Sequence, residues 1–386
     1  MRNKRLDILR CVAILLVLGR HGLVHGLWWT VGWSGVDLFF VLSGFLISGL
    51  LFTQYLATQS IQPARFYIRR FFKICPAFWA MLLASACIAV GYGLRVPLGA
   101  WLRELFFVQN YSRGVWRHTW SLAVEEHFYC LLPLFLMALI KISKNRKDPF
   151  RSIPQIFCFV TLTTLGMRYL VTLQPSYNPE QFWKITFLTH LRFGALFCGV
   201  TIGYFYYFRP GAIPRLVCTT ARRFAVEAVT AVLLSACVLF PEETRFMQTI
   251  GLTLVSLGFA GLLILCLTAE TSSGSSPISV AARKIGSAMA FVGRHSYSIY
   301  LWHVPIVAYG LKIVIALSPV PLSSSALTYI YAAASIPVGI LMARVVEFPA
   351  VKLRDKLFPR LTKFDVRELP GRADMTGREA PESALA

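Results

Sequence analysis

The sequence predicts an all-α, polytopic membrane helix bundle with about ten transmembrane helices. Of the 386 residues, 56% are apolar and only 15% are charged, and the mean hydropathy is +0.59. The apolar residues gather in long stretches that short basic segments separate. This composition excludes a disordered protein, a disulfide-scaffolded secreted domain and an ordinary soluble enzyme.

The transmembrane helices are predicted from the length of the apolar stretches, because a helix needs about 20 apolar residues to cross the hydrocarbon core. Ten stretches qualify: 6–26, 33–54, 74–94, 121–141, 153–173, 186–208, 222–240, 247–269, 288–314 and 325–346. The first carries Asp7, Arg10 and His21 and lacks a small-residue cleavage site. We therefore expect it to be a retained helix and not a signal peptide.

The distribution of basic residues predicts the orientation of these helices. Lysines and arginines gather at the N-terminus, at 65–73, at 141–151, at 209–223, at 283–284 and in the C-terminal segment. With ten spans all of these lie on one side of the membrane, which the positive-inside rule makes cytoplasmic. We expect a multi-pass protein of the plasma (inner) membrane with both termini cytoplasmic. Because the net charge of +21 is spread in this way, it indicates the lipid bilayer and not nucleic acid as the partner.

The domain organisation is predicted to be simple. Residues 1–355 form one transmembrane domain, and residues 356–386 form a polar, disordered cytoplasmic tail that contains Pro370, Gly371 and Pro381. The nine cysteines include no Cys-x-x-Cys pair, so we expect buried thiols and neither a disulfide framework nor a zinc site. No histidine and glutamate share metal-ligand spacing on a helix, and no metal site is expected.

A polar stripe marks the first predicted helix. An ionisable side chain inside a membrane helix costs roughly 2.5–3.5 kcal/mol, so each one needs a reason. Asp7, Arg10, Ile14, Val17 and His21 recur at spacings of three and four residues and share one helical face. At 1.5 Å per residue His21 lies roughly 16 Å beyond Arg10, toward the outer leaflet. The stripe either carries chemistry or joins helices through hydrogen bonds.

Carboxylates occur at a similar depth in the second and fourth predicted helices. Asp37 lies close to the outer end of the second helix, where it could orient the imidazole of His21 or simply favour the helix dipole. Glu125 and Glu126 are adjacent in the outer part of the fourth helix, and two carboxylates there are costly unless they face water or partners. Because consecutive residues point about 100° apart, we expect only one, Glu125 on the more polar face, to reach the site.

Further cations and one histidine complete the set of candidates. Arg192 lies near the outer end of the sixth helix, and His303 lies in the ninth. The alternative for His303 is a histidine of the bundle core. Arg69 and Arg70 belong to a basic, aromatic segment at the cytoplasmic side. They either anchor the helix to lipid phosphates or dock a phosphorylated cytoplasmic ligand, since arginine binds phosphate through two hydrogen bonds.

Six segments together resemble the acyltransferase 3 family of integral membrane sugar acyltransferases. In family order they are RLDILRCVAILLVLGRH (5–21), GVDLFFVLSGFLI (35–47), RRFFKICPAF (69–78), TWSLAVEEHFY (119–129), SYSIYLWHVPI (296–306) and VVEFP (345–349). Family members carry an arginine and a histidine separated by ten residues on the first helix, which here are Arg10 and His21. The resemblance covers about residues 4–355. The chain departs from the family at Gly194, where an acidic residue is usual, and at Arg20.

The resemblance implies transfer of an acyl group, commonly acetyl, from coenzyme A to a hydroxyl of an extracytoplasmic or lipid-linked carbohydrate. No permanently bound cofactor is expected, and acyl-CoA, above all acetyl-CoA, is the donor substrate. Arg69 and Arg70 would then dock the donor phosphates, with Arg10 along the path of the donor. An extended pantetheine arm reaches about 15–20 Å, which is enough to carry the thioester into the outer half of the bundle.

The corresponding hypothesis for the site assigns a role to each candidate. His21 is the general base, and Asp37 or Glu125 holds its other nitrogen. Arg192 or His303 stabilises the oxyanion, and a two-step route through acyl-His21 is equally compatible. Two other function classes stay open on the residues alone. One is a transporter or flippase of a lipid-linked sugar that uses the same residues as a proton relay, and the other is a sensor or scaffold with inert polar stripes.

Overall fold

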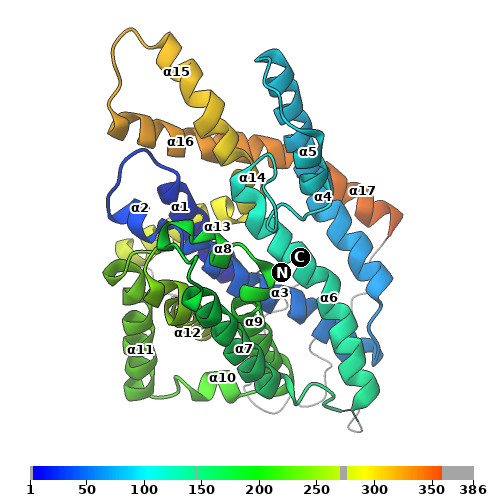
Figure 1. Cartoon of the computed structure of the whole chain (residues 1–386). Helices are drawn as coiled ribbons and strands as arrows, with labels where there is room; N and C mark the ends of the chain where they lie inside the picture. The colour runs from blue at the N-terminus through cyan, green and yellow to red at the C-terminus, as the bar shows by residue number, and fades with distance from the viewer. Residues whose placement is uncertain (1–2, 144–146, 270–275, 359–386) are drawn as a thin grey trace.

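The computed structural model describes residues 3–143, 147–269 and 276–358, and every regular element in these ranges is a helix (Figure 1). Seven helical runs of the described residues are long and apolar enough to cross a membrane, and α9 is a shorter apolar helix. The runs are Leu27–Thr58, Pro63–Gly91, Arg117–Ile142, Ile153–Leu173, Met247–Thr268, Ser296–Leu317 and Ser324–Leu357. The predicted all-α membrane bundle is confirmed, and the chain is a multi-pass membrane protein.

The helices follow one another with short connections. In chain order they are α1 (Lys4–Arg20), α2 (Leu27–Gly32), α3 (Gly35–Thr58), α4 (Pro63–Gly91), α5 (Leu98–Leu105), η1 (Arg117–Thr119), α6 (Trp120–Ile142), α7 (Ile153–Leu173), η2 (Pro179–Gln181), α8 (Trp183–Thr186), η3 (Thr189–Leu191), α9 (Phe193–Phe208), α10 (Ala212–Arg215), α11 (Thr220–Leu239), η4 (Met247–Gly251), α12 (Leu252–Thr268), α13 (Pro277–Arg294), α14 (Ser296–Pro305), η5 (Ile306–Gly310), α15 (Leu311–Leu317), α16 (Ser324–Met342), η6 (Ala343–Glu347) and α17 (Phe348–Leu357).

Each of the ten predicted spans coincides with a helix, and the prediction 153–173 matches α7. Several other boundaries differ, for example at 74–94, where α4 begins already at Pro63, and at 186–208, where α9 begins only at Phe193. The span 6–26 ends at Arg20, because α2 folds back and the Trp28 indole donates to the Leu15 carbonyl over 2.8 Å. The span 288–314 joins two helices, since the chain breaks at His295 between α13 and α14. The predicted spans 6–26, 186–208 and 222–240, observed as α1, α9 and α11, are not among the seven long apolar runs.

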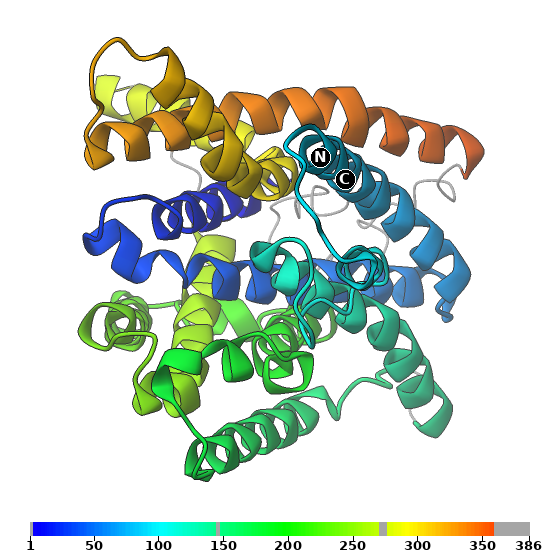
Figure 2. The same ribbon diagram turned by 45° about the horizontal axis from the view of Figure 1, so that its top comes forward.

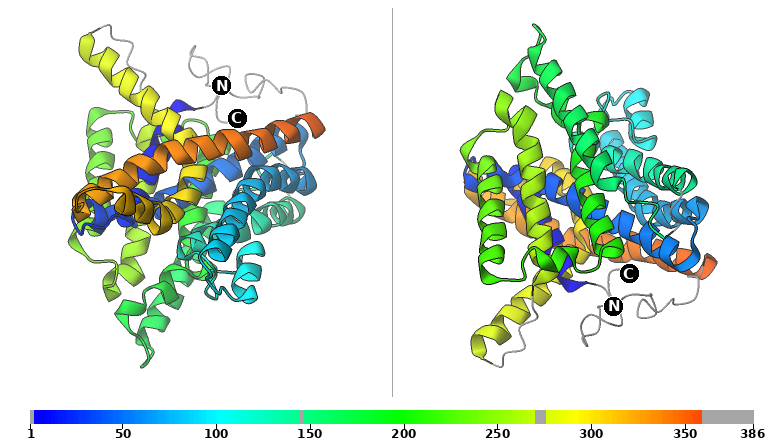
Figure 3. Two further views of the ribbon diagram at one scale, coloured as in Figure 1. Left: turned by 90° about the horizontal axis from the view of Figure 1, so that it is seen from above. Right: turned by 90° about the horizontal axis from the view of Figure 1, so that it is seen from below.

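Helix α3 lies at the centre of the bundle. Figure 2 shows it between the continuous helix α16–α17 on one side and α7 on the other, while α13 projects away from the bundle in Figure 3. The apolar side chains of α3 are buried along its whole length, for example Phe40, Phe45, Phe52 and Tyr55. Such a helix, apolar on all sides, needs neighbours on all sides. Helices α1, α4, α6 and α14 pack around this central helix and against one another.

The predicted division into a domain 1–355 and a tail 356–386 is only partly covered by the structure. The last described helix, α17, ends at Leu357. Residues 359–386, which make up almost all of the predicted tail, lie outside the described residues.

Candidate active site

Three histidines from distant parts of the sequence meet beside the end of α1. His21 is the C-terminal capping residue of α1, His118 lies in η1, and His303 lies in α14. The His303 Nε2 atom is 3.3 Å from the His21 Nδ1 atom, and the ring centroids of His118 and His303 are 5.0 Å apart. His118 and His303 are buried, whereas His21 is half-buried. The structure therefore brings together two predicted residues and adds His118, which the sequence reasoning passed over although it precedes the fourth predicted helix directly.

Backbone carbonyls determine which nitrogen of His21 carries its hydrogen. The His303 Nδ1 atom is 2.5 Å from the Tyr300 carbonyl oxygen, which can only accept, so this nitrogen is the donor and the Nε2 atom of the neutral ring is an acceptor. The His21 Nδ1 atom faces that acceptor and, at 3.1 Å, the Val17 carbonyl oxygen. It must therefore carry the hydrogen. The lone pair of neutral His21 is left on Nε2, which makes no hydrogen bond within the described residues.

Asp37, which with Glu125 was considered as a support for the His21 imidazole, pairs with another residue. An Asp37 Oδ1 atom accepts from Arg192 over 2.7 Å, and both side chains are buried. The Arg192 guanidinium also lies 5.4 Å from the ring centroid of Phe40 and 5.8 Å from that of Trp120. Two opposite charges that leave water together gain most from facing each other. Asp37 therefore neutralises Arg192 and does not support the imidazole.

Both adjacent glutamates face the protein interior, whereas only one of them, Glu125, was expected to reach the site. Glu125 is hydrogen bonded to Ser43 and Tyr129, and Ser43 is also hydrogen bonded to Tyr129. Glu126 lies within electrostatic reach of Arg70, as does Glu125. The reason is that α3 covers one side of α6 and α4 covers another. Two consecutive positions of α6 therefore meet protein instead of lipid.

A series of polar groups extends from the glutamates toward the histidines. Ser121 lies one turn before Glu125 on α6, and its hydroxyl is 2.6 Å from the Tyr300 hydroxyl. Tyr300 in turn donates to the His118 carbonyl over 2.6 Å. We call this series the polar path. Its members are Arg70, Glu126, Glu125, Tyr129, Ser43, Ser121, Tyr300, His118, His303 and His21.

At the other end of the path, Arg69 and Arg70, which were expected to dock phosphates together, have different partners. Arg70 is turned inward, where its guanidinium lies 5.7 Å from the Tyr129 ring centroid. Arg69 instead pairs with Asp355 of α17 over 3.3 Å. The Arg10 guanidinium also lies at this end, 3.7 Å from Asp7 and within electrostatic reach of Glu125. The basic residues at this end are therefore Arg10 and Arg70, and Arg69 lies next to Arg70 on α4.

A second ion pair crosses this end of the bundle and was not singled out as a site by sequence reasoning. Lys73 of α4 pairs with Glu347 of η6, and Glu347 also accepts from Ser298 of α14 over 2.6 Å. Glu347 is fully buried. Glu347 directly follows the predicted span 325–346, and a carboxylate at the end of a membrane helix is the signal that could have drawn attention to this residue. The pair holds α4, α14 and the α16–α17 helix together beside the path.

The connection that carries His118 is organised by Glu104. This carboxyl is fully buried, accepts from the Trp116 amide over 2.8 Å, and accepts from the Thr119 hydroxyl over 2.8 Å. Burial raises the pKa of Glu104 to about 7, and the hydrogen bonds oppose that rise. Within the described residues, no group of three or more His, Cys, Asp or Glu side chains is arranged to hold a metal ion.

Comparison with known proteins assigns the chain to a family. The sequence profile of the acyltransferase 3 family, an acyltransferase domain, matches residues 3–344. The chain belongs to the acyltransferase 3 family. The resemblance expected from the six segments is thereby confirmed, and the buried polar residues are those of an acyltransferase 3 membrane domain. No solved structure matches the chain.

Two curated relatives illustrate the family. Peptidoglycan O-acetyltransferase OatA of Listeria monocytogenes is 29% identical over 329 residues, which is 78% of this chain and 49% of the relative. O-acetyltransferase OatA of Staphylococcus aureus is 27% identical over 332 residues, 79% of this chain and 50% of the relative. The chain thus spans about half the length of the curated relatives it matches.

Proposed function

We propose that this chain transfers an acetyl group from acetyl-CoA on the cytoplasmic side to a hydroxyl group of an extracytoplasmic carbohydrate. The observation that carries the proposal is the polar path, which runs from the inward-turned Arg70 to His21. The names of the relatives favour acetyl as the group transferred and O-acetylation as the reaction. The word peptidoglycan in the name of the Listeria relative makes a cell-wall glycan the first acceptor to test.

The donor would enter from the side where Arg10 and Arg70 lie. Its phosphates are polyanionic and match these guanidiniums, with Arg69 beside them. The extended pantetheine arm, about 15–20 Å long, would follow the polar path and bring the thioester to His21. Glu125 and Glu126 line this route and neutralise Arg10 and Arg70 while the donor is absent. The proposal therefore includes cytoplasmic termini and a location in the plasma membrane.

The chemistry follows from the free Nε2 atom of His21. As the acceptor oxygen attacks the thioester carbonyl, Nε2 takes the hydroxyl proton. A carbon–oxygen bond forms, the carbon–sulfur bond breaks, and the imidazolium returns the proton to the departing thiolate. The Nδ1 hydrogen stays directed at Val17 and His303 throughout, which stabilises the imidazolium. General-base help of this kind is worth ~10²–10⁴-fold. A two-step route, in which Nε2 itself is acylated first, uses the same atom.

The test compares His21→Gln with His25→Gln. His25 lies four residues on in an exposed loop and stacks on Trp29, off the polar path. We expect His21→Gln to lower acetyl transfer ~10²–10⁴-fold while His25→Gln retains it, with both variants inserted equally in the membrane. The readout is the acetylated fraction of envelope glycan by mass spectrometry in cells that express each variant. Full transfer by His21→Gln would overturn the proposed base.

The polar path would also suit a proton relay in a transporter of lipid-linked sugar. Acetyl-CoA separates the two functions, because a transporter needs no thioester. Isolated protein that binds acetyl-CoA and releases free thiol supports transfer. Glycan translocation without any thiol release would favour the transporter.

A further inference from the structure

A small cavity lies between α7, α9 and α12, three helices that pack side by side (Figure 1). It leaves about 20 Å³ for the centre of a water-sized sphere. Two arginines line the cavity: Arg168 of α7, and Arg192, the residue that caps the N-terminus of α9. Thr161, Thr164 and Gly194 also line it. Arg168 was not a candidate in the sequence analysis, although an arginine inside a predicted span is the usual sign of a functional site.

The positive charge around the cavity exceeds the negative charge. Arg168 is only 4% exposed, and its hydrogen bonds go to neutral acceptors, the Thr164 carbonyl and the Thr253 hydroxyl. The carboxylate that acts on it electrostatically is Asp37, which is hydrogen bonded to Arg192 and therefore serves two guanidiniums. Arg192, only 3% exposed, already uses Asp37. Glu242, the next carboxylate that acts on Arg192, is 2.8 Å from Arg20.

The cavity also contains hydrogen-bond donors that no acceptor meets. The Nε atom of Arg192 and the hydroxyl of Thr161 are buried and have no hydrogen-bond partner within the described residues. Thr161, Thr164 and Arg168 lie at spacings of three and four on one face of α7. Two buried guanidiniums that share one carboxylate keep an excess positive charge, which is unfavourable in a membrane bundle because neither water nor lipid compensates it.

We infer that this cavity is an anion-binding site. Its size admits one halide ion or one charged oxygen of a larger group, since a single water molecule already needs roughly 10–15 Å³ by the same measure. The occupant is held by Arg168, by the Nε atom of Arg192 and by the Thr161 hydroxyl. It neutralises the second guanidinium and ties α7 to α9 and α12. The site is separate from the polar path and does not depend on the proposed acetyl transfer.

Gly194 offers a direct way to test this inference. A Cβ atom at this position would lie 3.4 Å from the Thr164 hydroxyl oxygen and 3.8 Å from the Thr161 hydroxyl oxygen. These are ordinary contacts, so a small side chain fits and points toward the cavity. The carboxylate of Gly194→Asp would occupy the place of the anion, and Gly194→Asn is the matched neutral control.

The experiment measures thermal unfolding of the purified full-length protein in sodium bromide and in sodium gluconate at equal ionic strength. We expect bromide to raise the Tm of the wild type and of Gly194→Asn saturably. Gly194→Asp should unfold at a higher temperature than the wild type in gluconate and should not respond to bromide. Arg168→Gln should also lose the response, and if it does not fold, the two Gly194 variants decide the outcome.

A second arm distinguishes a free ion from a lipid headgroup. The wild type and Gly194→Asp are compared in gluconate in nanodiscs of phosphatidylcholine alone or with phosphatidylglycerol. Stabilisation of the wild type alone by phosphatidylglycerol identifies the headgroup phosphate as an occupant, and stabilisation by bromide alone identifies a free anion. Equal responses of the wild type, Gly194→Asp and Arg168→Gln to bromide and to phosphatidylglycerol would overturn the inference, because the cavity would then hold only water.

Discussion

The carbonyl oxygens of Val17 and Tyr300 control the chemistry available to His21. Each sits one turn before a histidine and accepts from its Nδ1 atom, Val17 from His21 and Tyr300 from His303. His303 thereby presents an acceptor to His21, and the lone pair of His21 is directed to Nε2. Under the proposed function we therefore infer that His303 is a positioning residue for His21, in place of the oxyanion role considered for it from the sequence. Arg192, the other oxyanion candidate, is held by Asp37.

His303→Gln should lower kcat for acetyl transfer about 10-fold, with the KM for acetyl-CoA unchanged. The loss is smaller than for His21→Gln because the Val17 carbonyl still holds the Nδ1 hydrogen. Steady-state release of free thiol by the purified protein measures both constants. A variant with wild-type kcat would show that His303 does not position the base.

Glu104 should make the stability of the outer connection depend on pH. Its pKa is raised by burial from an ordinary 4.5 to about 7, so the folded state binds the proton more tightly than the unfolded state. The stabilisation is complete below about pH 4.5, decreases as the pH rises toward 7 and is absent above it, a loss of about 3 kcal/mol at most. Thermal unfolding of the wild type at pH 5 and pH 8 should show a lower Tm at pH 8.

Glu104→Gln is the matched control for this pH dependence. The amide keeps an acceptor for the Trp116 N–H, and the Thr119 hydroxyl can still donate to the Trp116 carbonyl, 2.7 Å away. The difference in Tm between pH 5 and pH 8 should shrink in this variant. An undiminished difference would assign the pH dependence to another group.

At the level of the elements, α3 and α9 pack backbone against backbone. Gly44 of α3 faces the Leu196 carbonyl, where a Cβ atom would lie only 1.9 Å from the oxygen. Gly199 of α9 faces the Val41 carbonyl, with a corresponding distance of 2.1 Å. Small residues permit such backbone approach between membrane helices. This contact sets the position of α9, and hence of Arg192 opposite Asp37.

Gly44→Ala and Gly199→Ala should each destabilise the protein by about 1–3 kcal/mol or more, because the clash is with backbone that cannot rotate away. Gly166→Ala on α7 is the control, since a Cβ atom there meets nothing within 4 Å. Size-exclusion chromatography of the detergent-solubilised protein after heating to increasing temperatures gives the Tm that measures this effect. Equal stability of all three variants would contradict the packing described for α3 and α9.

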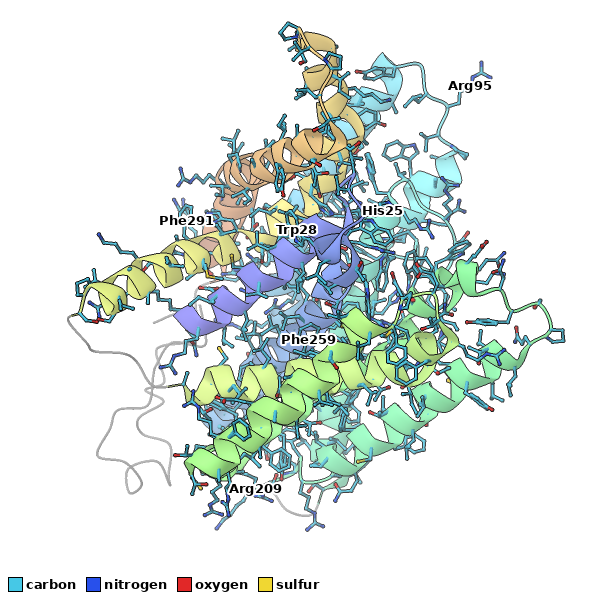
Figure 4. All side chains as sticks on the ribbon, turned by 90° about the vertical axis from the view of Figure 1, so that its left-hand side faces the viewer. His25, Trp28, Arg95, Arg209, Phe259 and Phe291 are labelled. Carbon is cyan, nitrogen blue, oxygen red and sulfur yellow. The ribbon has the colours of Figure 1, made fainter. Side chains whose placement is uncertain are left out.

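At the scale of the whole molecule, the connections that contain Arg95 and Arg209 lie toward opposite ends of the bundle. Figure 4 shows His25 and Arg95 toward one end of the bundle and Arg209 toward the opposite end. The connection that contains Arg209 was expected on the cytoplasmic side, and Arg95 on the other side. His21 lies four residues before His25 and so lies near the Arg95 end. The acceptor would therefore meet the base from outside the cell.

This orientation predicts the labelling of introduced and native thiols by a membrane-impermeant maleimide. The exposed Cys87, Cys130 and Cys158 are first replaced by serine, while the exposed Cys218, in the connection after Arg209, is kept. Arg95→Cys should be labelled in intact cells. Cys218 should be labelled only after the membrane is permeabilised, and buried Cys11 should stay unlabelled in both cases. Labelling of Cys218 in intact cells would show that the topology is the reverse of the one predicted, with His21 near the cytoplasmic side.

The amino-acid sequence by itself determined the helices and the polar face of the first one, because hydropathy and periodicity are properties of a single segment. It predicted ten helical stretches, and it singled out His21, Glu125 and His303. It could not determine how each helix is rotated against its neighbours. That rotation, decided by contacts such as Gly44 on Leu196, paired Asp37 with Arg192 and left Arg168 to share the same carboxylate. Such pairings depend on atoms brought together from distant segments, so only the tertiary structure decided them.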